Sequence, residues 1–301
     1  MIIIFRFYLG MPIATLHPGG QNLATGMWTA AAGASAQARN LDVVANNLAN
    51  TDTPAFKKDL PTFKEYLGNV EREHLAAEIP RSPMKDKDFY PLDGRDQSYV
   101  VMDGTHTSHR QGGLRVTQEQ LDLAMEGPGF LEVDTPAGIR YTRYGSLKLS
   151  PTGQLVTAEG FSVLSDQPLG LGVISSESSS GGNPLARGIQ LRDRGSNLTI
   201  SEEGEVFSGD EFIAKLSVVE FQDLKKLKKT GAHLFESLDS KNKREPLHTQ
   251  VRQGLLETSN VNPIEEMTNM IRANRLFEQD MKSLKTFSEM MGREANDVGK
   301  L

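Results

Sequence analysis

Residues 40–67 read NLDVVANNLANTDTPAFKKDLPTFKEYL, and this stretch decides how the chain is organised. Its first half has the apolar spacing of a helix, but Asn46, Asn47 and Asn50 interrupt it. Asparagine is a poor helix former because its amide competes for backbone partners. The helix must end near Thr53, because the residue before a proline is disfavoured in the helical region. The asparagines are therefore either a solvated helix end or amides that bond a segment packed against the helix.

Upstream of these asparagines, apolar residues recur at alternating spacings of four and three, which predicts one face of a helix over residues 21–50. The positions on that face are Leu23, Met27, Ala30, Ala34, Ala38 (or Gln37), Leu41, Ala45 (or Val44) and Leu48. This face is rich in alanine, so a partner helix could approach closely.

The C-terminal segment has the same alternation, at Ile264, Met267, Ile271, Asn274, Phe277, Met281, Leu284, Phe287 and Met291. Asn262 suits the N-cap of this helix and Pro263 suits its first position. Glu265 completes an arrangement like a capping box. Neither terminal helix has a local partner, so we expect the two to pair with each other as a coiled-coil-like terminal domain.

The residues between the helices predict a central, mainly antiparallel β domain, so the expected fold class is α+β. Short alternating apolar runs are separated by turn signals at 136–138 and 151–153. The predicted organisation is a leader of doubtful relevance at 1–20, an N-terminal helix and turn at 21–68, an extended connector at 69–95, the β domain at 96–235 with a polar insertion at 175–200, and a return segment and C-terminal helix at 236–301.

Composition excludes several classes of function. The chain has 301 residues and a formal net charge of −6, so nucleic-acid binding has no electrostatic support. It contains no cysteine, which removes disulfides, thiolate metal sites and cysteine nucleophiles. No apolar run approaches the roughly 20 residues that a membrane-spanning helix needs. The apolar run at 2–9 is too short as well, and we expect the leader to be either untranslated or dispensable.

Candidate catalytic patterns are weak. His106 and His109 have an H-x-x-H spacing, but they lie in a Gly- and Thr-rich stretch without a helical pattern, whereas zinc proteases need histidines four apart on a helix. The basic run KKLKK at 225–229 is typical of a solvated edge. Nucleophile elbows and glycine-rich phosphate loops are absent from the sequence. We therefore expect no enzymatic activity, no cofactor and no metal site.

Three stretches together resemble the bacterial flagellar rod and hook proteins. They are ATGMWTAAAGASAQARNLDVVANNLANTDTPAFKKD at 24–59, a central stretch that begins GPGFLEV at 127–133, and VRQGLLETSNVNPIEEMTNMIRANRLFEQDMKSL at 251–284. The NNLAN motif followed by a turn and Phe-Lys, and the G-x-L-E-x-S-N-V motif before the last helix, carry the resemblance. The chain is most similar to the proximal rod branch of that family, and the distal rod branch is close. Ala55 departs from the family pattern, in which glycine is common at this position.

The resemblance implies a non-catalytic structural subunit of the basal-body rod, made in the cytoplasm, exported through the flagellar type III apparatus and assembled across the periplasm with copies of itself and neighbouring rod proteins. It also implies that the terminal helices carry the subunit contacts. The expected contact residues are Leu41, Val44, Asn46, Asn47, Leu48, Asn50, Asn260, Asn262, Met267, Met270, Ile271, Phe277, Met281 and Leu284.

Three alternatives remain open on the sequence. The chain could be a distal rod or hook subunit of the same family, an envelope enzyme that acts on peptidoglycan, or a soluble adaptor that binds a partner through a helical hairpin. The lack of a catalytic pattern argues against the enzyme. Concentration-dependent helical assembly would separate a filament subunit from an adaptor.

Overall fold

The computed structural model describes residues 18–68, 97–167, 187–191 and 198–298. Most of the predicted leader, all of the predicted connector at 69–95 and most of the polar insertion at 175–200 lie outside the described residues. The chain divides into two compact units. Unit 1 comprises Met1–Asp42, Pro61–Gly104 and Thr268–Leu301, and unit 2 comprises Val43–Leu60 and Thr105–Met267.

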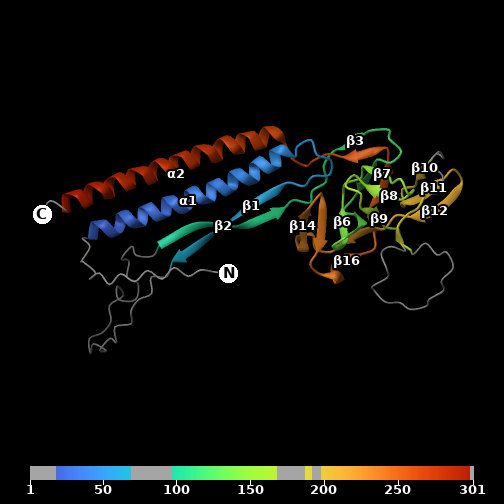
Figure 1. The fold of residues 1–301 in the computed structure, drawn as a ribbon, viewed down its shortest axis with the longest axis horizontal. Coiled ribbons are helices and arrows are strands. Elements are labelled where there is room, and N and C mark those ends of the chain that lie inside the picture. The colour runs from blue at the N-terminus through green and yellow to red at the C-terminus, as the bar shows by residue number, and fades with distance from the viewer. Residues whose placement is uncertain (1–17, 69–96, 168–186, 192–197, 299–301) are drawn as a thin grey trace, which may run out of the picture. The chain divides into compact units, whose positions relative to one another are not determined.

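Unit 1 contains most of the two helices, α1 (Pro18–Ala49) and α2 (Pro263–Val298), and most of a ribbon formed by β1 (Asp59–Gly68) and β2 (Gln97–Thr107). The helices lie side by side and run in opposite directions (Figure 1). A Cβ atom at Gly26 would lie 2.8 Å from Cζ of Phe287, and one at Gly33 would lie 3.1 Å from Oδ2 of Asp280. The absence of a side chain at these glycines therefore permits the close approach.

The predicted coiled-coil-like pairing of the terminal helices is wrong. Met267, Ile271 and Met281, which the pattern placed in its seam, are 49%, 56% and 47% exposed. A coiled-coil seam would bury such apolar side chains in holes on the facing helix. Instead, a carboxylate, that of Asp280, faces Gly33. The observed fold is two long terminal helices and a predominantly β central domain, without a regular apolar seam.

Unit 2 holds the central β domain. Its strands are β3 (Leu114–Val116), β4 (Leu123–Glu126), β5 (Phe130–Thr135), β6 (Gly138–Thr142), β7 (Leu147–Leu149), β8 (Leu155–Thr157), β9 (Ser162–Val163), β10 (Leu198–Ile200), β11 (Glu205–Ser208), β12 (Glu211–Lys215), β13 (Val218–Phe221), β14 (Leu227–Gly231), β15 (Leu234–Ser237), β16 (Lys243–Arg244), β17 (Gln250–Gln253) and β18 (Leu255–Glu257). Two short 3₁₀ helices, η3 (Leu224–Lys226) and η4 (Ser240–Asn242), precede β14 and β16.

The largest sheet has the strand order β14-β15-β6-β5-β9-β8-β7, with β13 paired to β5 and β16 paired to β13. A second sheet has the order β10-β11-β12, and two pairs, β17-β4 and β18-β3, bring the chain back toward α2. The strand pairs described in unit 2 are antiparallel, as the turn signals predict. Thus β14 is an edge strand, while β5 lies inside the sheet.

Alternating side chains of these strands form the apolar core. Leu131 and Val133 of β5 are almost fully buried and pack in one cluster with Leu155, Ile189 and Leu216. At about 25 cal/mol per Å² of apolar surface, this burial is the main source of stability for the β domain. No helix in the described part of the chain is both long and apolar enough to cross a membrane.

Candidate functional site: the end-joining junction

The asparagines at the C-terminal end of α1 and directly after it have separate roles. Asn47 is 1% exposed, and its amide forms two hydrogen bonds with the backbone of Asp59: Nδ2 donates to the carbonyl at 2.8 Å and Oδ1 accepts from the N–H at 3.0 Å. Asn50 donates to the carbonyl of Asn46 at 2.8 Å, which satisfies one of the last helical carbonyls. The side chain of Asn46 is exposed. Asn47 therefore fixes the turn that ends the helix.

The buried carboxylate of Glu257 lies where the segment after α1 meets the segment before α2. Glu257 Oε1 lies 2.5 Å from Nζ of Lys57 and accepts from the N–H of Gly112 at 2.8 Å, and Oε2 accepts from Nε of Arg143 at 2.9 Å. Lys57 also donates to the carbonyl of Arg110 at 2.8 Å. The Lys57 and Glu257 side chains are fully buried, so these bonds replace water that both charges have lost.

The electrostatics of this cluster keep the carboxylate ionised. Burial alone would raise the pKa of Glu257, but the charges of Arg143 and Lys57 hold it below its usual value. Burial, together with the nearby Arg143, lowers the pKa of Lys57 to about 8, although Glu257 opposes that change. Arg143 completes its bonding by donating to the carbonyls of Gly129 and Met125 at 2.9 and 3.3 Å.

The side chain of Asn260 joins the same two ends a few residues further on. Its Oδ1 accepts from the N–H of Lys58 at 2.7 Å, and its Nδ2 donates to the carbonyls of Ser108 and Arg110 at 2.9 and 3.0 Å. Its backbone N–H donates to the carbonyl of Phe56 at 3.3 Å. One amide thus bonds three segments that are far apart in the sequence.

The first turn of α2 contributes further contacts. Lys58 Nζ lies 2.5 Å from Glu266 Oε1 and 3.2 Å from Glu265 Oε1, and burial of Glu266 is nearly complete. The predicted N-cap is present, since Asn262 Oδ1 accepts from the N–H of Ile264 at 3.1 Å. We call the set Asn47, Lys57, Lys58, Arg143, Glu257 and Asn260 the end-joining junction. Its charged and amide side chains form ion pairs and hydrogen bonds, so the junction holds together segments that are far apart in the sequence.

His109 is next to the junction. Its ring lies 5.9 Å from that of Phe130 and 5.3 Å from that of Phe235, centroid to centroid. Burial, followed by the charges of Lys57 and Arg143, lowers the pKa of His109 to about 4. Its buried Nδ1 has no hydrogen-bond partner among the described residues. His106 is exposed, and no group of three His, Cys, Asp or Glu side chains in the described part could hold a metal ion.

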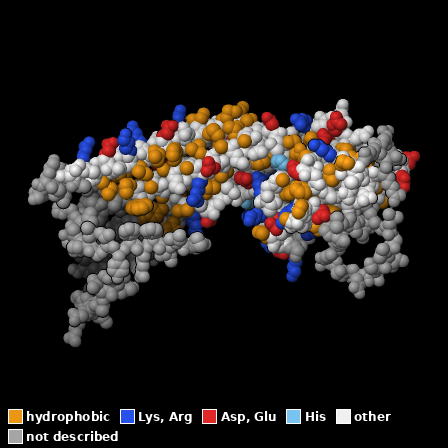
Figure 2. All heavy atoms as spheres, in the orientation of Figure 1, with side chains coloured by type: hydrophobic (Ala, Val, Ile, Leu, Met, Phe, Trp, Pro, Cys, Tyr) orange, Lys and Arg blue, Asp and Glu red, His pale blue; other side chains and the backbone are white. Residues whose placement is uncertain are grey.

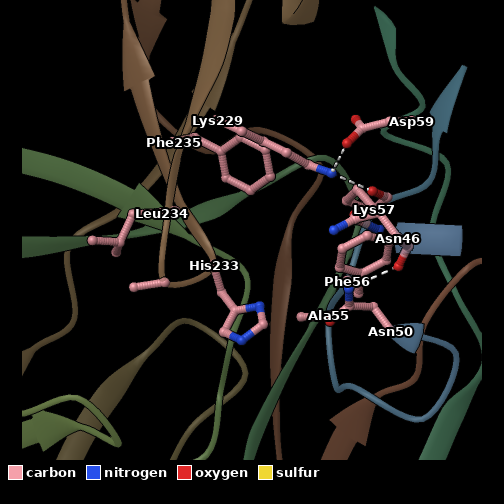
Figure 3. Close-up of a pocket in the computed structure, with 12 residues that line it drawn as sticks. Asn46, Asn50, Ala55, Phe56, Lys57, Asp59, Lys229, His233, Leu234 and Phe235 are labelled. Carbon is pink, nitrogen blue, oxygen red and sulfur yellow. Dashed lines mark hydrogen bonds and ion pairs between the residues drawn. The ribbon is translucent and has the colours of Figure 1, made fainter. Parts of the chain in front are cut away.

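A pocket of about 250 Å³ adjoins the junction (Figure 3). Lys229 reaches across one side of it, 2.8 Å from Asp59 Oδ2 and 4.4 Å from the centre of the Phe56 ring. On the other side, the turn between β14 and β15 presents His233. Ala55, Ala232 and His233 have φ of 56°, 47° and 57°, a left-handed conformation that costs energy in residues other than glycine. The pocket contains no pairing of a nucleophile with a base.

The predicted contact residues fall into three groups. Val44 and Asn47 are buried. Partly buried residues are Leu41, Leu48, Asn50, Asn260, Met270, Phe277 and Leu284, and exposed ones are Asn46, Asn262, Met267, Ile271 and Met281. Asn47 and Asn260 join segments of one chain in this structure, and the role of the other residues as subunit contacts stays a prediction.

Sequence reasoning missed the charged members of the junction. Lys57 and Glu257 both lie inside the two motifs that carry the family resemblance, directly after Phe56 and directly before Thr258-Ser259-Asn260. Charges within such motifs could have been flagged as a pair. Arg143, in a β-rich stretch, gave no signal.

Three family models match the chain. One is described as flagella basal body rod protein and matches residues 27–57; one, flagellar hook protein FlgE/F/G D1 domain, matches residues 124–208; and one, flagellar basal body rod FlgEFG protein C-terminal, matches residues 252–298. The first and third ranges contain Asn47, Lys57, Glu257 and Asn260, so the junction joins the two terminal matches.

Relatives align over most of the chain. The flagellar basal-body rod protein FlgF of Caulobacter vibrioides is 30% identical over 264 residues, which cover 87% of this chain and 93% of that protein. FlgG of Borreliella burgdorferi is 30% identical over 279 residues, covering 88% and 96%. FlgG of Buchnera aphidicola from Acyrthosiphon pisum is 28% identical over 285 residues, also covering 88% and 96%. The chain therefore belongs to the flagellar basal-body rod protein family, a family of structural proteins rather than enzymes.

Proposed function

We propose that this chain is a structural subunit of the flagellar basal-body rod that assembles with other rod and hook proteins. The observation that supports assembly is the amount of apolar surface left uncovered along α2 and the β1–β2 ribbon. Met267, Ile271 and Met281 fall on one side of α2 at about 3.6 residues per turn. Figure 2 shows hydrophobic side chains gathered along the helices on the face it presents.

The β1–β2 ribbon adds to this surface. Phe63 and Tyr66 of β1 are 46% and 62% exposed, and Val100 and Val101 of β2 are 48% and 44% exposed. A two-stranded ribbon is marginally stable alone in water, and exposed apolar patches commonly mark interaction sites. We infer that neighbouring subunits cover this ribbon and the exposed side of α2.

The test compares two double variants of the full chain in a flagellated host that lacks the natural gene. Ile271→Glu with Met281→Glu places charges on the exposed apolar side of α2. Gln279→Glu with Ser283→Glu is the matched control, because both residues are exposed on the other side of the same helix. We expect both proteins to fold, but only the control to appear in purified basal bodies and to restore swimming. Equal incorporation of the two would contradict the proposal.

Delivery through the flagellar export apparatus is a further part of the proposal, supported by family membership. Cells with a working apparatus should place the protein outside the cytoplasm, and cells without one should retain it. Deleting residues 2–20 should leave delivery unchanged if the leader is dispensable. The relatives include both FlgF and FlgG, so the proximal position in the rod stays a prediction.

A further inference from the structure

A basic hollow of about 410 Å³ lies on unit 2, beside His109. We define it by His106, His109, Leu224, Lys225, Lys228 and Leu238, which line it. These residues come from the end of β2, from η3 and β14, and from the segment after β15. The hollow is notable in a chain whose net charge is −6.

Two lysines of this hollow lack a counter-charge. Of the four lysines at 225–229, Lys226 pairs with Asp239 at 3.0 Å and Lys229 pairs with Asp59 at 2.8 Å. The exposed Lys225 and Lys228 pair with no carboxylate among the described residues. Their positive charges therefore remain available to an incoming acidic group.

The nearby carboxylates are already engaged. Glu236 is the cross-strand neighbour of Lys228, but its carboxylate pairs with Arg140 at 3.2 Å. Asp59 accepts from Thr107 at 2.7 Å through Oδ1 and contacts Lys229 through Oδ2. The remaining nearby carboxylate, Asp223, accepts from the backbone N–H of Lys225 at 3.0 Å and forms no ion pair with either lysine. Beside the charges, Leu238 is 70% exposed, so the hollow offers apolar surface as well.

The β11–β12 hairpin has the complementary chemistry. Its two-residue turn, Gly209 and Asp210, leads into Glu211 and Phe212, and Gly209 has φ of 61° with open space around it. Phe212 is 55% exposed. Asp210 and Glu211 are exposed and form no ion pair among the described residues. This tip presents two carboxylates and an aromatic ring, while the hollow presents two ammonium groups and an exposed leucine.

We propose that the basic hollow receives the tip of the β11–β12 hairpin from a second copy of the chain. The two surfaces lie at opposite ends of the β domain (Figure 1), so one chain cannot satisfy itself. A contact between different patches on identical chains is heterologous. When it is repeated it builds a ring if the rotation closes and an open helical filament if it does not. The contact rests on the proposed function as a rod subunit. It adds a β-domain contact to those of the terminal helices.

Lysines are also placed on edge strands simply to prevent strand pairing, and β14 is an edge strand. The two roles give different results on charge reversal. Under the proposal, Lys225→Glu with Lys228→Glu should weaken self-association ~100-fold or more, because like charges then face each other. Asp210→Lys with Glu211→Lys should do the same. A matched control, Arg115→Glu with Lys148→Glu, makes the same charge change at exposed basic residues that do not line the hollow.

Mixing the two reversed proteins provides the sharper result. Each reversed surface then finds its complement on the other protein, so the mixture should recover association in sedimentation velocity while neither protein associates alone. Edge protection alone predicts no loss in either variant and no recovery on mixing. That result would overturn the proposal.

The cysteine-free sequence allows a direct test in assembled basal bodies. Lys228→Cys and Glu211→Cys in the same chain should give a ladder of disulfide-linked dimers, trimers and longer products on oxidation. Neither single-cysteine chain can form such a ladder beyond dimers. If the chain is present in basal bodies without a ladder, the contact is wrong and the proposed function stands. If the chain is absent from basal bodies while a wild-type chain is also absent, the proposed function itself fails.

Discussion

The end-joining junction and the exposed side of α2 differ in how completely their side chains are buried within one chain. At the junction, Lys57 and Glu257 have no exposed side-chain surface and every charge has a partner. Along α2, Ile271 and Met281 are about half exposed. The contacts of the junction are completed within one chain, and we propose that a neighbouring subunit covers the exposed side of α2. The difference teaches that the chain can fix the segments next to its terminal helices before any partner is present.

The largest expected effect is the loss of the shared carboxylate at the junction. Glu257→Gln keeps the shape of the side chain but leaves Lys57 and Arg143 buried without a counter-charge, which should cost about 3–5 kcal/mol of unfolding free energy. Chemical denaturation of the full chain measures it. Glu236→Gln is the control, because the Glu236–Arg140 pair is partly exposed and should be worth about 1 kcal/mol or less. Equal losses of unfolding free energy in the two variants would show that the buried junction stabilises the protein no more than a partly exposed ion pair does.

Acidification should loosen the same region. The pKa of His109 is about 4 in the folded protein and about 6.5 when unfolded, so the unfolded chain binds more protons between these values. The contribution of His109 to stability should therefore be full above pH 6.5 and be lost as the pH falls to about 4, by roughly 3 kcal/mol in total.

His109→Phe keeps an aromatic ring against Phe130 and should remove most of that slope. The slope that remains belongs to His233, whose pKa is also lowered by burial, and below about pH 4.5 to the carboxylates. An unchanged slope in His109→Phe would show that the burial of this histidine does not govern acid stability.

Alanine substitution of the neighbouring residues Asn47 and Asn46 should give a smaller difference in unfolding free energy. Asn47→Ala removes both bonds to the backbone of Asp59 and leaves a buried donor and acceptor, which should cost about 1–3 kcal/mol. Asn46→Ala, at an exposed position, should stay within about 0.5 kcal/mol of wild type. If Asn46 makes subunit contacts, it should instead reduce incorporation into basal bodies without changing the unfolding midpoint.

The smallest effect concerns Ala55, whose φ of 56° suits glycine. Ala55→Gly relieves the left-handed strain of the folded protein but raises the conformational entropy of the unfolded chain. We expect a net gain of about 0.5 kcal/mol in unfolding free energy. The same change in the exposed helix interior, Ala45→Gly, should cost about 1 kcal/mol. Thermal unfolding of the two proteins should shift in opposite directions, and a loss in both would show that Ala55 is not strained.

Local signals in the sequence were sufficient for the elements of the fold. The N-cap at Asn262, the proline after it and the turns of the β domain are each determined by residues a few positions apart, and they are found where the sequence predicts them. The family was also recognisable, because its motifs are contiguous. These predictions depend only on short-range geometry.

The coiled-coil-like seam and the charged junction were not predictable in this way. A three-four alternation shows that α2 is amphipathic, but Ile271 and Met281 satisfy that pattern equally well whether they face a helix of the same chain or a neighbouring subunit. The bond between Lys57 and Glu257 spans 200 positions, and no periodicity reports on such a separation. A lone lysine in a sequence predicts an exposed position, because a buried charge needs a partner that the local pattern does not contain.

The same separation has a consequence for the order of events during synthesis. A ribosome makes Lys57 long before Glu257, so the lysine has no counter-charge until nearly the whole chain has been made. A product that stops short of Glu257 keeps Lys57 and Arg143 without their shared carboxylate and cannot close the turn after α1 onto the β domain. The ion pair therefore forms only in a chain that has been synthesised past Glu257, and a prematurely terminated chain lacks the contact that holds the segment after α1 to the segment before α2.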